Sequence, residues 1–220
     1  MGFILNIETA TKNCSVALAQ QGNVVALREF AGEGYSHAEK LHIFIEEVLK
    51  EAQTTFEALD AVAVSMGPGS YTGLRIGVSA AKGLCYALGI PLLAIDTLAV
   101  LARQITISEG VIIPMIDARR MEVYSAIFDK EYDKIVPIQA EIITADSFLE
   151  YRSQPCHLIG DGAQKCKEIL LGNNFIYHND VVYPSSAEMA ALSYNKHQKS
   201  DTVDVAYFEP FYLKDFVMNR

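Results

Sequence analysis

A glycine-rich segment at residues 67–73, with the sequence Gly-Pro-Gly-Ser-Tyr-Thr-Gly, contains the residue types that most directly suggest chemistry. The segment lies between a short apolar stretch, residues 61–66, and a stretch with helical periodicity that begins at Thr72. A glycine-rich turn before a helix exposes backbone N–H groups, which can hold a phosphate or another anion. The candidate ligands for such an anion or nucleotide are Gly67, Gly69 and Ser70.

The known phosphate-loop motifs fit this segment only in part. A Walker loop needs Lys and then Ser or Thr after its last glycine, but Gly73 is followed by Leu74 and Arg75. The dinucleotide fingerprint fits the first two glycines, whereas its third glycine comes one residue late. Three interpretations therefore stay open: a tight structural turn, an anion site and a dinucleotide site.

Other constellations that perform catalysis or bind metals are incomplete in this sequence. His37 and His42 are the only histidines close in sequence, and their spacing turns one ring about 140° from the other around a helix. No serine lies in a Gly-x-Ser-x-Gly elbow, and His157 and His178 have no evident triad partner. The sequence therefore predicts neither a metal site nor a catalytic residue.

Composition excludes several classes of protein. The chain has 220 residues, is half hydrophobic and carries a formal net charge of −9, with no basic run longer than Arg119-Arg120. Direct nucleic-acid binding needs clustered positive charge, so a partner is expected to supply most of the surface that contacts RNA. No apolar stretch is long enough to span a membrane and the N-terminus has no signal-peptide pattern, so we predict a cytoplasmic protein without membrane contact. Four cysteines without metal-ligand spacing are predicted to be reduced and mostly buried: Cys14, Cys85, Cys156 and Cys166.

The candidate residues depend on an order of strands and helices that occurs twice along the chain. The expected strands of the first half are residues 3–8, 14–20, 24–30, 61–66 and 91–96. Three helices are expected in the first half. Ser36 is the N-cap of the first, and the other two span residues 72–88 and 97–105. The second half is expected to have strands at residues 111–117, 123–128, 135–143 and 157–159, and helices near residues 164–171 and 185–195. The sequence thus predicts two α/β lobes, residues 1–107 and residues 108–220.

The predicted helix at residues 72–88 carries two stripes of small residues. The first stripe, at every fourth position, is Gly73, Gly77 and Ala81, and the second is Ala80, Gly83 and Ala87. Each glycine in a helix costs about 1 kcal/mol relative to alanine, so a close contact must compensate. Small residues let another element approach closely, and this element belongs either to the same chain or to another subunit.

Five segments together resemble the TsaB (YeaZ-type) family. The most specific is Ser-Met-Gly-Pro-Gly-Ser-Tyr-Thr-Gly-Leu-Arg-Ile-Gly at residues 65–77. The others are residues 4–10, residues 36–39, residues 117–119 with 122–124, and residues 210–214, where Lys stands in place of the family's Arg. The resemblance covers nearly the whole chain, although it is sparse in the second half.

The resemblance implies a two-lobed, actin-like ATPase (ASKHA, ribonuclease H-like) fold with a reduced second lobe. It also implies a non-catalytic adaptor in the synthesis of N6-threonylcarbamoyladenosine at position 37 of tRNAs that read codons starting with A. The adaptor binds and activates a paralogous TsaD-type subunit, which carries the metal and transfers the threonylcarbamoyl group, and a TsaE-type ATPase joins the assembly. No cofactor is expected on this chain itself, and tRNA is expected to bind mainly through the complex.

The family's interface is built from its first two helices, which gives the small-residue stripe a role in binding the partner. The predicted interface residues are Leu41, Ile45, Thr72, Gly73, Arg75, Ile76, Gly77, Ala80 and Ala81. A bulky substitution such as Gly77→Leu is then expected to break the complex and leave the isolated fold mostly intact. Isolated subunits are expected to pair through the same helices, because an exposed apolar stripe needs cover.

The catalytic paralogue has two histidines four positions apart, where this chain has Thr97 and Leu101. Neither side chain can replace an imidazole ligand. The family's phosphate loop is altered as well, since residues 8–11 read Glu-Thr-Ala-Thr without a glycine, and residues 160–162 are either a remnant nucleotide loop or a turn. The alternative hypothesis is an autonomous nucleotide-dependent transferase or hydrolase of actin-like fold, or a glycoprotease-like peptidase.

Overall fold

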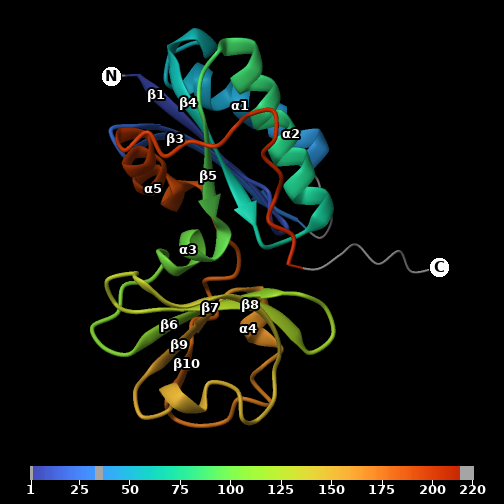
Figure 1. Cartoon of the computed structure of the whole chain (residues 1–220), viewed down its shortest axis with the longest axis vertical. Helices are drawn as coiled ribbons and strands as arrows, with labels where there is room; N and C mark the ends of the chain where they lie inside the picture. Colours follow the sequence, from blue (N-terminus) through green and yellow to red (C-terminus); the bar gives the residue numbers. More distant parts are fainter. Residues whose placement is uncertain (1, 33–36, 214–220) are drawn as a thin grey trace, which may run out of the picture. The chain divides into compact units, whose positions relative to one another are not determined.

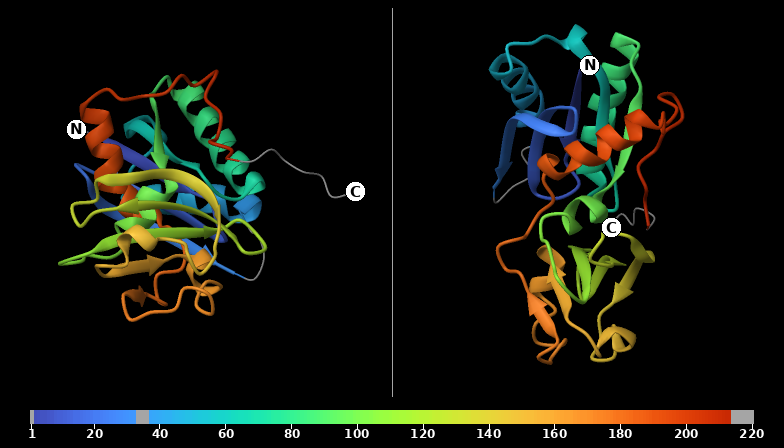
Figure 2. Two further views of the ribbon diagram at one scale, coloured as in Figure 1. Left: turned by 60° about the horizontal axis from the view of Figure 1, so that its bottom comes forward. Right: turned by 90° about the vertical axis from the view of Figure 1, so that its left-hand side faces the viewer.

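The computed structural model describes residues 2–32 and 37–213, which form two compact units (Figures 1 and 2). The first unit consists of Met1–Thr97 and Ser185–Arg220, and the second of Leu98–Pro184. The predicted boundary near residue 107, with all of 108–220 in the second lobe, is therefore wrong. The chain returns to the first unit because helix α5 (Ser186–Gln198) packs against the sheet of that unit. Ser36, the predicted N-cap, lies outside the described residues.

The first unit is built on a five-stranded sheet, as far as the described residues show. Its order is β3-β2-β1-β4-β5, with antiparallel pairing from β1 to β3 and parallel pairing from β1 to β5. The strands are β1 (Phe3–Glu8), β2 (Asn13–Gln20), β3 (Asn23–Ala31), β4 (Leu59–Gly67) and β5 (Leu92–Asp96). Four of these strands match the predicted ranges closely, and β4 starts two residues earlier than expected.

Helices cover both faces of this sheet (Figure 1). Side chains alternate along β1, so Leu5 and Ile7 face α1 (His37–Glu51) and α2 (Tyr71–Leu88), with which they share one apolar core. Glu8 pairs across the strands with Ser15, and both lie on the opposite face, where Ser15 Oγ is 2.7 Å from Ser186 Oγ of α5. The α5 face of the sheet is therefore more polar than the α1–α2 face.

The second unit repeats the strand order of the first with fewer helices. Its sheet has the order β10-β9-β6-β7-β8, so β6 takes the place of β1 and β9 that of β4. The strands are β6 (Val111–Asp117), β7 (Glu122–Phe128), β8 (Lys134–Ile142), β9 (Cys156–Ile159) and β10 (Phe175–Tyr177). Where the first unit has α1 and α2, the second has only the 3-10 helix η2 (Leu149–Tyr151) and the short α4 (Asp161–Gln164). Helix α3 (Thr97–Ala102) connects the two units in the sequence.

The first small-residue stripe of α2 faces the sheet of its own unit. A Cβ atom on Gly73 would lie 2.1 Å from Thr9 O, and one on Gly77 would lie 2.2 Å from Thr9 Oγ1. Thr9 Oγ1 in turn donates a hydrogen bond to Gly73 O (2.8 Å). A Cβ atom on Gly83, in the second stripe, would meet no atom within 4 Å. The first stripe therefore packs against Thr9 of the same chain and not against another subunit. The expectation that Gly77→Leu leaves the isolated fold mostly intact is wrong, because a leucine side chain would overlap Thr9.

The four cysteines are free and buried, which confirms the prediction that they do not form disulfides. Burial raises the pKa of Cys14, Cys85 and Cys166 to about 11. These thiols are therefore protonated near neutral pH and are poor nucleophiles. No helix within the described residues is sufficiently long and apolar to span a membrane.

Gly77→Ala is expected to lower the free energy of unfolding by about 1–3 kcal/mol, because the added methyl group would overlap Thr9 in a packed core. Gly83→Ala is the matched control, and we expect it to stabilise the chain by about 0.5–1 kcal/mol, since open space surrounds this position. Urea denaturation of both variants measures the difference. Equal effects of the two substitutions would contradict the inward orientation of Gly77.

The native protein is expected to react very slowly with a thiol reagent such as DTNB at pH 7.5, because all four thiols are buried. In denaturant, all four should react rapidly. Absorbance of the released thiolate counts the reactive groups in each state. Rapid modification of a cysteine in the native state would show that its burial is only transient.

Candidate functional site

The structure separates the nine predicted interface residues into two groups. Five are buried in the core of the first unit, so they are not available to a partner: Leu41, Ile45, Gly73, Gly77 and Ala81. Their assignment to the interface is wrong, because the apolar faces of α1 and α2 pack on the sheet of their own unit. Thr72 and Arg75 are exposed, and Ile76 and Ala80 are half-buried.

The accessible residues lie on one side of α2, which we call the outer face of α2. Its members share a spacing of three to four positions and are exposed or half-buried: Thr72, Arg75, Ile76, Ser79, Ala80, Gly83, Tyr86 and Ala87. A pocket in this face is lined by Tyr71 together with Thr72, Arg75, Ile76 and Ser79. Ser79 and Tyr86 are not among the predicted interface residues, although the second stripe of small residues lies on this side of the helix.

The chain's last described segment, residues 203–213, runs beside α2 (Figure 1). Lys82 Nζ donates hydrogen bonds to the carbonyl oxygens of Ala206 (3.0 Å) and Phe208 (3.1 Å). Near the start of the helix, Arg75 Nε donates to Tyr212 Oη (3.2 Å). The segment therefore forms one border of the outer face of α2.

The Arg75 guanidinium also lies over the ring of Tyr71, 4.2 Å from its centroid. The rings of Tyr71 and Tyr212 are in contact as well, with centroids 5.1 Å apart. A cation and two aromatic rings thus form a cluster at the N-terminal end of α2. This cluster would have been hard to find in the sequence, because Tyr212 lies far from the other two residues.

The glycine-rich loop uses several of its N–H groups within the chain. Gly67 N donates to Thr97 Oγ1 (3.1 Å), and Ser70 N donates to Ala10 O (2.7 Å). A Cβ atom on Gly69 would lie 2.3 Å from Ala10 O, so glycine is needed for this close approach. Ser70 caps α2 by accepting a hydrogen bond from Gly73 N (3.3 Å). These contacts favour the interpretation as a tight structural turn, and binding of an anion by Gly67, Gly69 and Ser70 stays a prediction.

Glu8 is an acid that is fully buried beside this loop. One of its carboxylate oxygens, Oε1, accepts a hydrogen bond from Ala10 N (2.6 Å). Burial raises the pKa of Glu8 to about 7, although hydrogen bonds from Ala10 and Ser65 act in the opposite direction. The side chain therefore gains or loses a proton in the neutral pH range.

Three histidines of this chain, and the two positions that correspond to metal ligands in the paralogue, make contacts within the chain itself. His37 is buried, with Nε2 2.8 Å from Thr11 O. Thr97 is the acceptor for Gly67 N, and Leu101 is buried in an apolar cluster of the second unit. His157 and His178, for which the sequence showed no partner, contact each other, with Nδ1 and Nε2 2.9 Å apart.

Comparison with known proteins agrees with this architecture. A family model described as TsaD, tRNA N6-adenosine threonylcarbamoyltransferase, matches residues 34–218. The chain is 28% identical to the TsaB protein of Escherichia coli over 97% of this chain and 95% of that protein. It is 29% identical to the TsaB protein of Bacillus subtilis over 96% of this chain and 93% of that protein. Both proteins are described by name as tRNA threonylcarbamoyladenosine biosynthesis proteins.

Solved structures show the same fold. YeaZ from Pseudomonas aeruginosa superposes with a TM-score of 0.82 at 24% identity, covering 97% of this chain and all of that chain. Component A of the (R)-2-hydroxyglutaryl-CoA dehydratase of Acidaminococcus fermentans superposes with a TM-score of 0.53 at 13% identity, covering 90% of this chain and all of that chain. The two-lobed, actin-like ATPase fold predicted from the sequence is thereby confirmed.

The fold and the family match define a member of the TsaD family of tRNA N6-adenosine threonylcarbamoyltransferases and their relatives, and the chain belongs to this family. Within it, similarity over nearly the full length of curated TsaB proteins places the chain in the TsaB (YeaZ-type) family. The resemblance inferred from the sequence motifs is confirmed.

Glu8→Gln is expected to make the chain more stable above pH 7, by up to about 3 kcal/mol, because it removes the need to bury a charge. The folded-state pKa is raised, so the folded protein binds the extra proton more tightly than the unfolded chain. The contribution of Glu8 to stability therefore falls as pH rises from about 4.5 to about 7. Urea unfolding between pH 4 and pH 8.5 measures this dependence.

The control for this experiment is Glu46→Gln, which replaces an exposed glutamate on α1. It should leave the pH dependence of unfolding close to that of the unchanged protein. If Glu8→Gln retained the original pH dependence, the raised pKa of Glu8 would be refuted.

Proposed function

We propose that this chain is the TsaB-type, non-catalytic subunit of the system that makes N6-threonylcarbamoyladenosine in tRNAs reading codons that start with A. In this proposal it binds a TsaD-type partner and activates it. The support is membership of the family and the near-full-length similarity to proteins named for threonylcarbamoyladenosine biosynthesis. Such a subunit works in the cytoplasm, where a TsaE-type ATPase joins the assembly.

Gly83 is the observation that carries the docking part of the proposal. Glycine inside a helix costs about 1 kcal/mol relative to alanine, and at Gly73 and Gly77 the close contact with Thr9 compensates for this cost. At Gly83, no atom of the described chain occupies the space above the helix. A helix of a partner that packs on the outer face of α2 would use this space, since small residues allow helix axes to come within about 8 Å.

Other accessible residues of α1 and α2 suit a protein interface. Tyr86 is 87% exposed, and tyrosine is among the residues that are enriched at protein interfaces. Ile43 of α1 is 53% exposed, and Ile76 adds apolar surface on α2. When the chain is isolated, a second copy covers the same face, so the homodimer and the complex with the partner exclude each other.

The non-catalytic part of the proposal rests on the two positions that bind the metal in the paralogue. Thr97 and Leu101 are fully buried, where they support the glycine-rich loop and the core of the second unit. Metal and ATP belong to the partner subunits in this proposal. With a net charge of −9, the chain contributes little to the long-range attraction of tRNA, which binds mainly through the complex.

Depletion of the chain in its native cell tests the proposed function. Mass spectrometry of hydrolysed tRNA should then show loss of threonylcarbamoyladenosine, and re-expression should restore it. Reconstitution with purified components separates the roles of the subunits: the TsaD-type partner should be active only when this chain is present. Transfer of the threonylcarbamoyl group by this chain alone would refute its non-catalytic role.

Gly83→Phe is expected to weaken binding of the TsaD-type partner at least about tenfold, because the ring would fill the space that the partner helix needs. Ala191→Phe, at an exposed position of helix α5, is the control of similar bulk and should leave binding unchanged. Calorimetry gives the affinities, and thermal unfolding verifies that both variants fold. If Gly83→Phe bound the partner with unchanged affinity, the assignment of the interface to the outer face of α2 would be wrong.

A further inference from the structure

The turn between β6 and β7 has an unusual combination of backbone and side chains. Arg119 and Arg120 have φ angles of 71° and 51°, in the left-handed region that favours glycine and asparagine. Glycine and asparagine adopt such angles most readily, whereas longer side chains are strained there. Both arginines are exposed, so the core of the second unit does not need their side chains.

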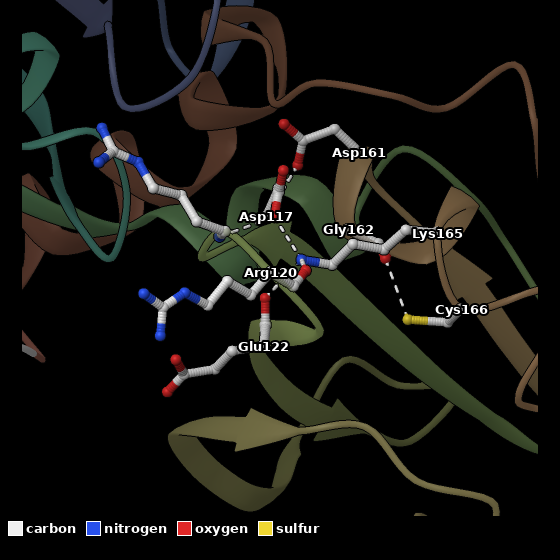
Figure 3. A network of polar contacts seen from close by, with 8 residues as sticks. Asp117, Arg120, Glu122, Asp161, Gly162, Lys165 and Cys166 are labelled. Atoms are coloured by element: carbon white, nitrogen blue, oxygen red, sulfur yellow. Dashed lines mark hydrogen bonds and ion pairs between the residues drawn. The ribbon is translucent and has the colours of Figure 1, made fainter.

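A network of polar contacts beneath the turn holds it in this strained form (Figure 3). Asp117 Oδ1 accepts a hydrogen bond from Arg119 N (2.8 Å) and forms an ion pair with Lys165 Nζ. Lys165 Nζ also donates to the carbonyl oxygens of Arg120 (2.8 Å) and Glu122 (2.6 Å). The backbone of the turn is therefore fixed from the side of Lys165, and Figure 3 shows the Arg120 side chain extending away from this cluster.

Residues 160–162, which the sequence left as either a nucleotide-loop remnant or a turn, support this network. Asp161 Oδ1 accepts a hydrogen bond from Asp117 N (2.9 Å). A Cβ atom on Gly160 would lie 2.1 Å from Met115 O, so this segment packs directly on β6. The segment thus positions the end of β6, where the turn with Arg119 and Arg120, called the arginine turn below, begins.

The guanidinium groups of Arg119 and Arg120 differ from those of the other arginines in the described part of the chain. Arg75, Arg103 and Arg152 bind oxygen atoms of their own unit, and Arg28 forms ion pairs with Glu47 and Glu51. Among the described residues, neither guanidinium of the turn makes a hydrogen bond or an ion pair. Lys165 already neutralises Asp117, the carboxylate that begins the turn.

We propose that Arg119 and Arg120 bind phosphate groups of an RNA backbone. This inference rests on the proposed function, in which the chain works on tRNA as part of a complex. Planar guanidinium groups form paired hydrogen bonds with phosphate oxygens, and arginine is therefore the preferred residue for such contacts. The overall charge of −9, with Glu122 and Asp161 close to the turn, limits the contact to one or two phosphates.

Contacts with phosphates position an RNA without reading its sequence. The turn therefore orients a tRNA that the complex has already attracted, and it contributes no preference for particular bases. The strained backbone is the cost of placing two arginines next to each other at the tip of a rigid hairpin.

The test measures binding of an unmodified tRNA transcript to the full complex of this chain with its TsaD-type partner. The double variant Arg119→Gln, Arg120→Gln should weaken binding about tenfold or more at low salt. It should also reduce the slope of log K against log salt by about 1 to 2, because fewer counterions are released. The charge-matched control is Lys130→Gln, Lys199→Gln, which removes two exposed lysines and should change both quantities much less.

A second double variant separates loss of contact from loss of structure. Arg119→Asn, Arg120→Gly suits the left-handed turn, so it should raise Tm by about 2–4 °C and still lose the same tRNA affinity. The proposal is overturned if either arginine variant binds tRNA normally, or if the lysine control loses as much affinity. It is also overturned if the arginine variants no longer bind the partner, since the arginines would then belong to a protein interface.

The same experiments keep the two proposals apart. If the arginine variants bind and modify tRNA normally within an active complex, only the assignment of the turn fails. If depletion of the whole chain leaves threonylcarbamoyladenosine unchanged, the proposed function itself fails.

Discussion

The contact of α2 with the end of β1 is the constraint on which the first unit depends. Gly73 and Gly77 let the helix axis approach so closely that Thr9 occupies the positions where their side chains would be. Thr9 secures the contact by donating a hydrogen bond to Gly73 O, and the loop before α2 adds the bond from Ser70 N to Ala10 O. These contacts orient α2 on the sheet, and the orientation decides which side of the helix remains accessible to other molecules.

Local patterns in the sequence predicted most elements of the fold, but they could not say what each helix face would contact. The periodicity of α1 and α2 identified an apolar face correctly, whereas the assignment of Leu41 and Ile45 to a partner was wrong because that face covers the chain's own sheet. The spacing of small residues identified two stripes on α2, and only the packing shows that Gly77 faces inward and Gly83 outward. The sequence thus defines a helix and its period, but burial depends on the tertiary neighbours.

Contacts between distant parts of the chain explain the remaining differences. The boundary near residue 107 was predicted from the repeat of strand patterns. These patterns do not show that α5 packs on the first sheet, through contacts such as that of Ser15 with Ser186. The support of the arginine turn by Lys165 was missed for the same reason, because 45 positions separate Lys165 from Arg120. Beta strand β10, with only three residues, was too short for its pattern to be recognised.

The division of the chain has a consequence for how the protein is made. The second unit is inserted between Thr97 and Ser185, so the first unit consists of two pieces that are far apart in the sequence. During translation, the polar face of the first sheet, including Glu8 and Ser15, remains uncovered until α5 has left the ribosome. The second unit, which is continuous, has all its residues available earlier, so the part of the protein that is synthesised first is the last to have its sheet covered on both faces.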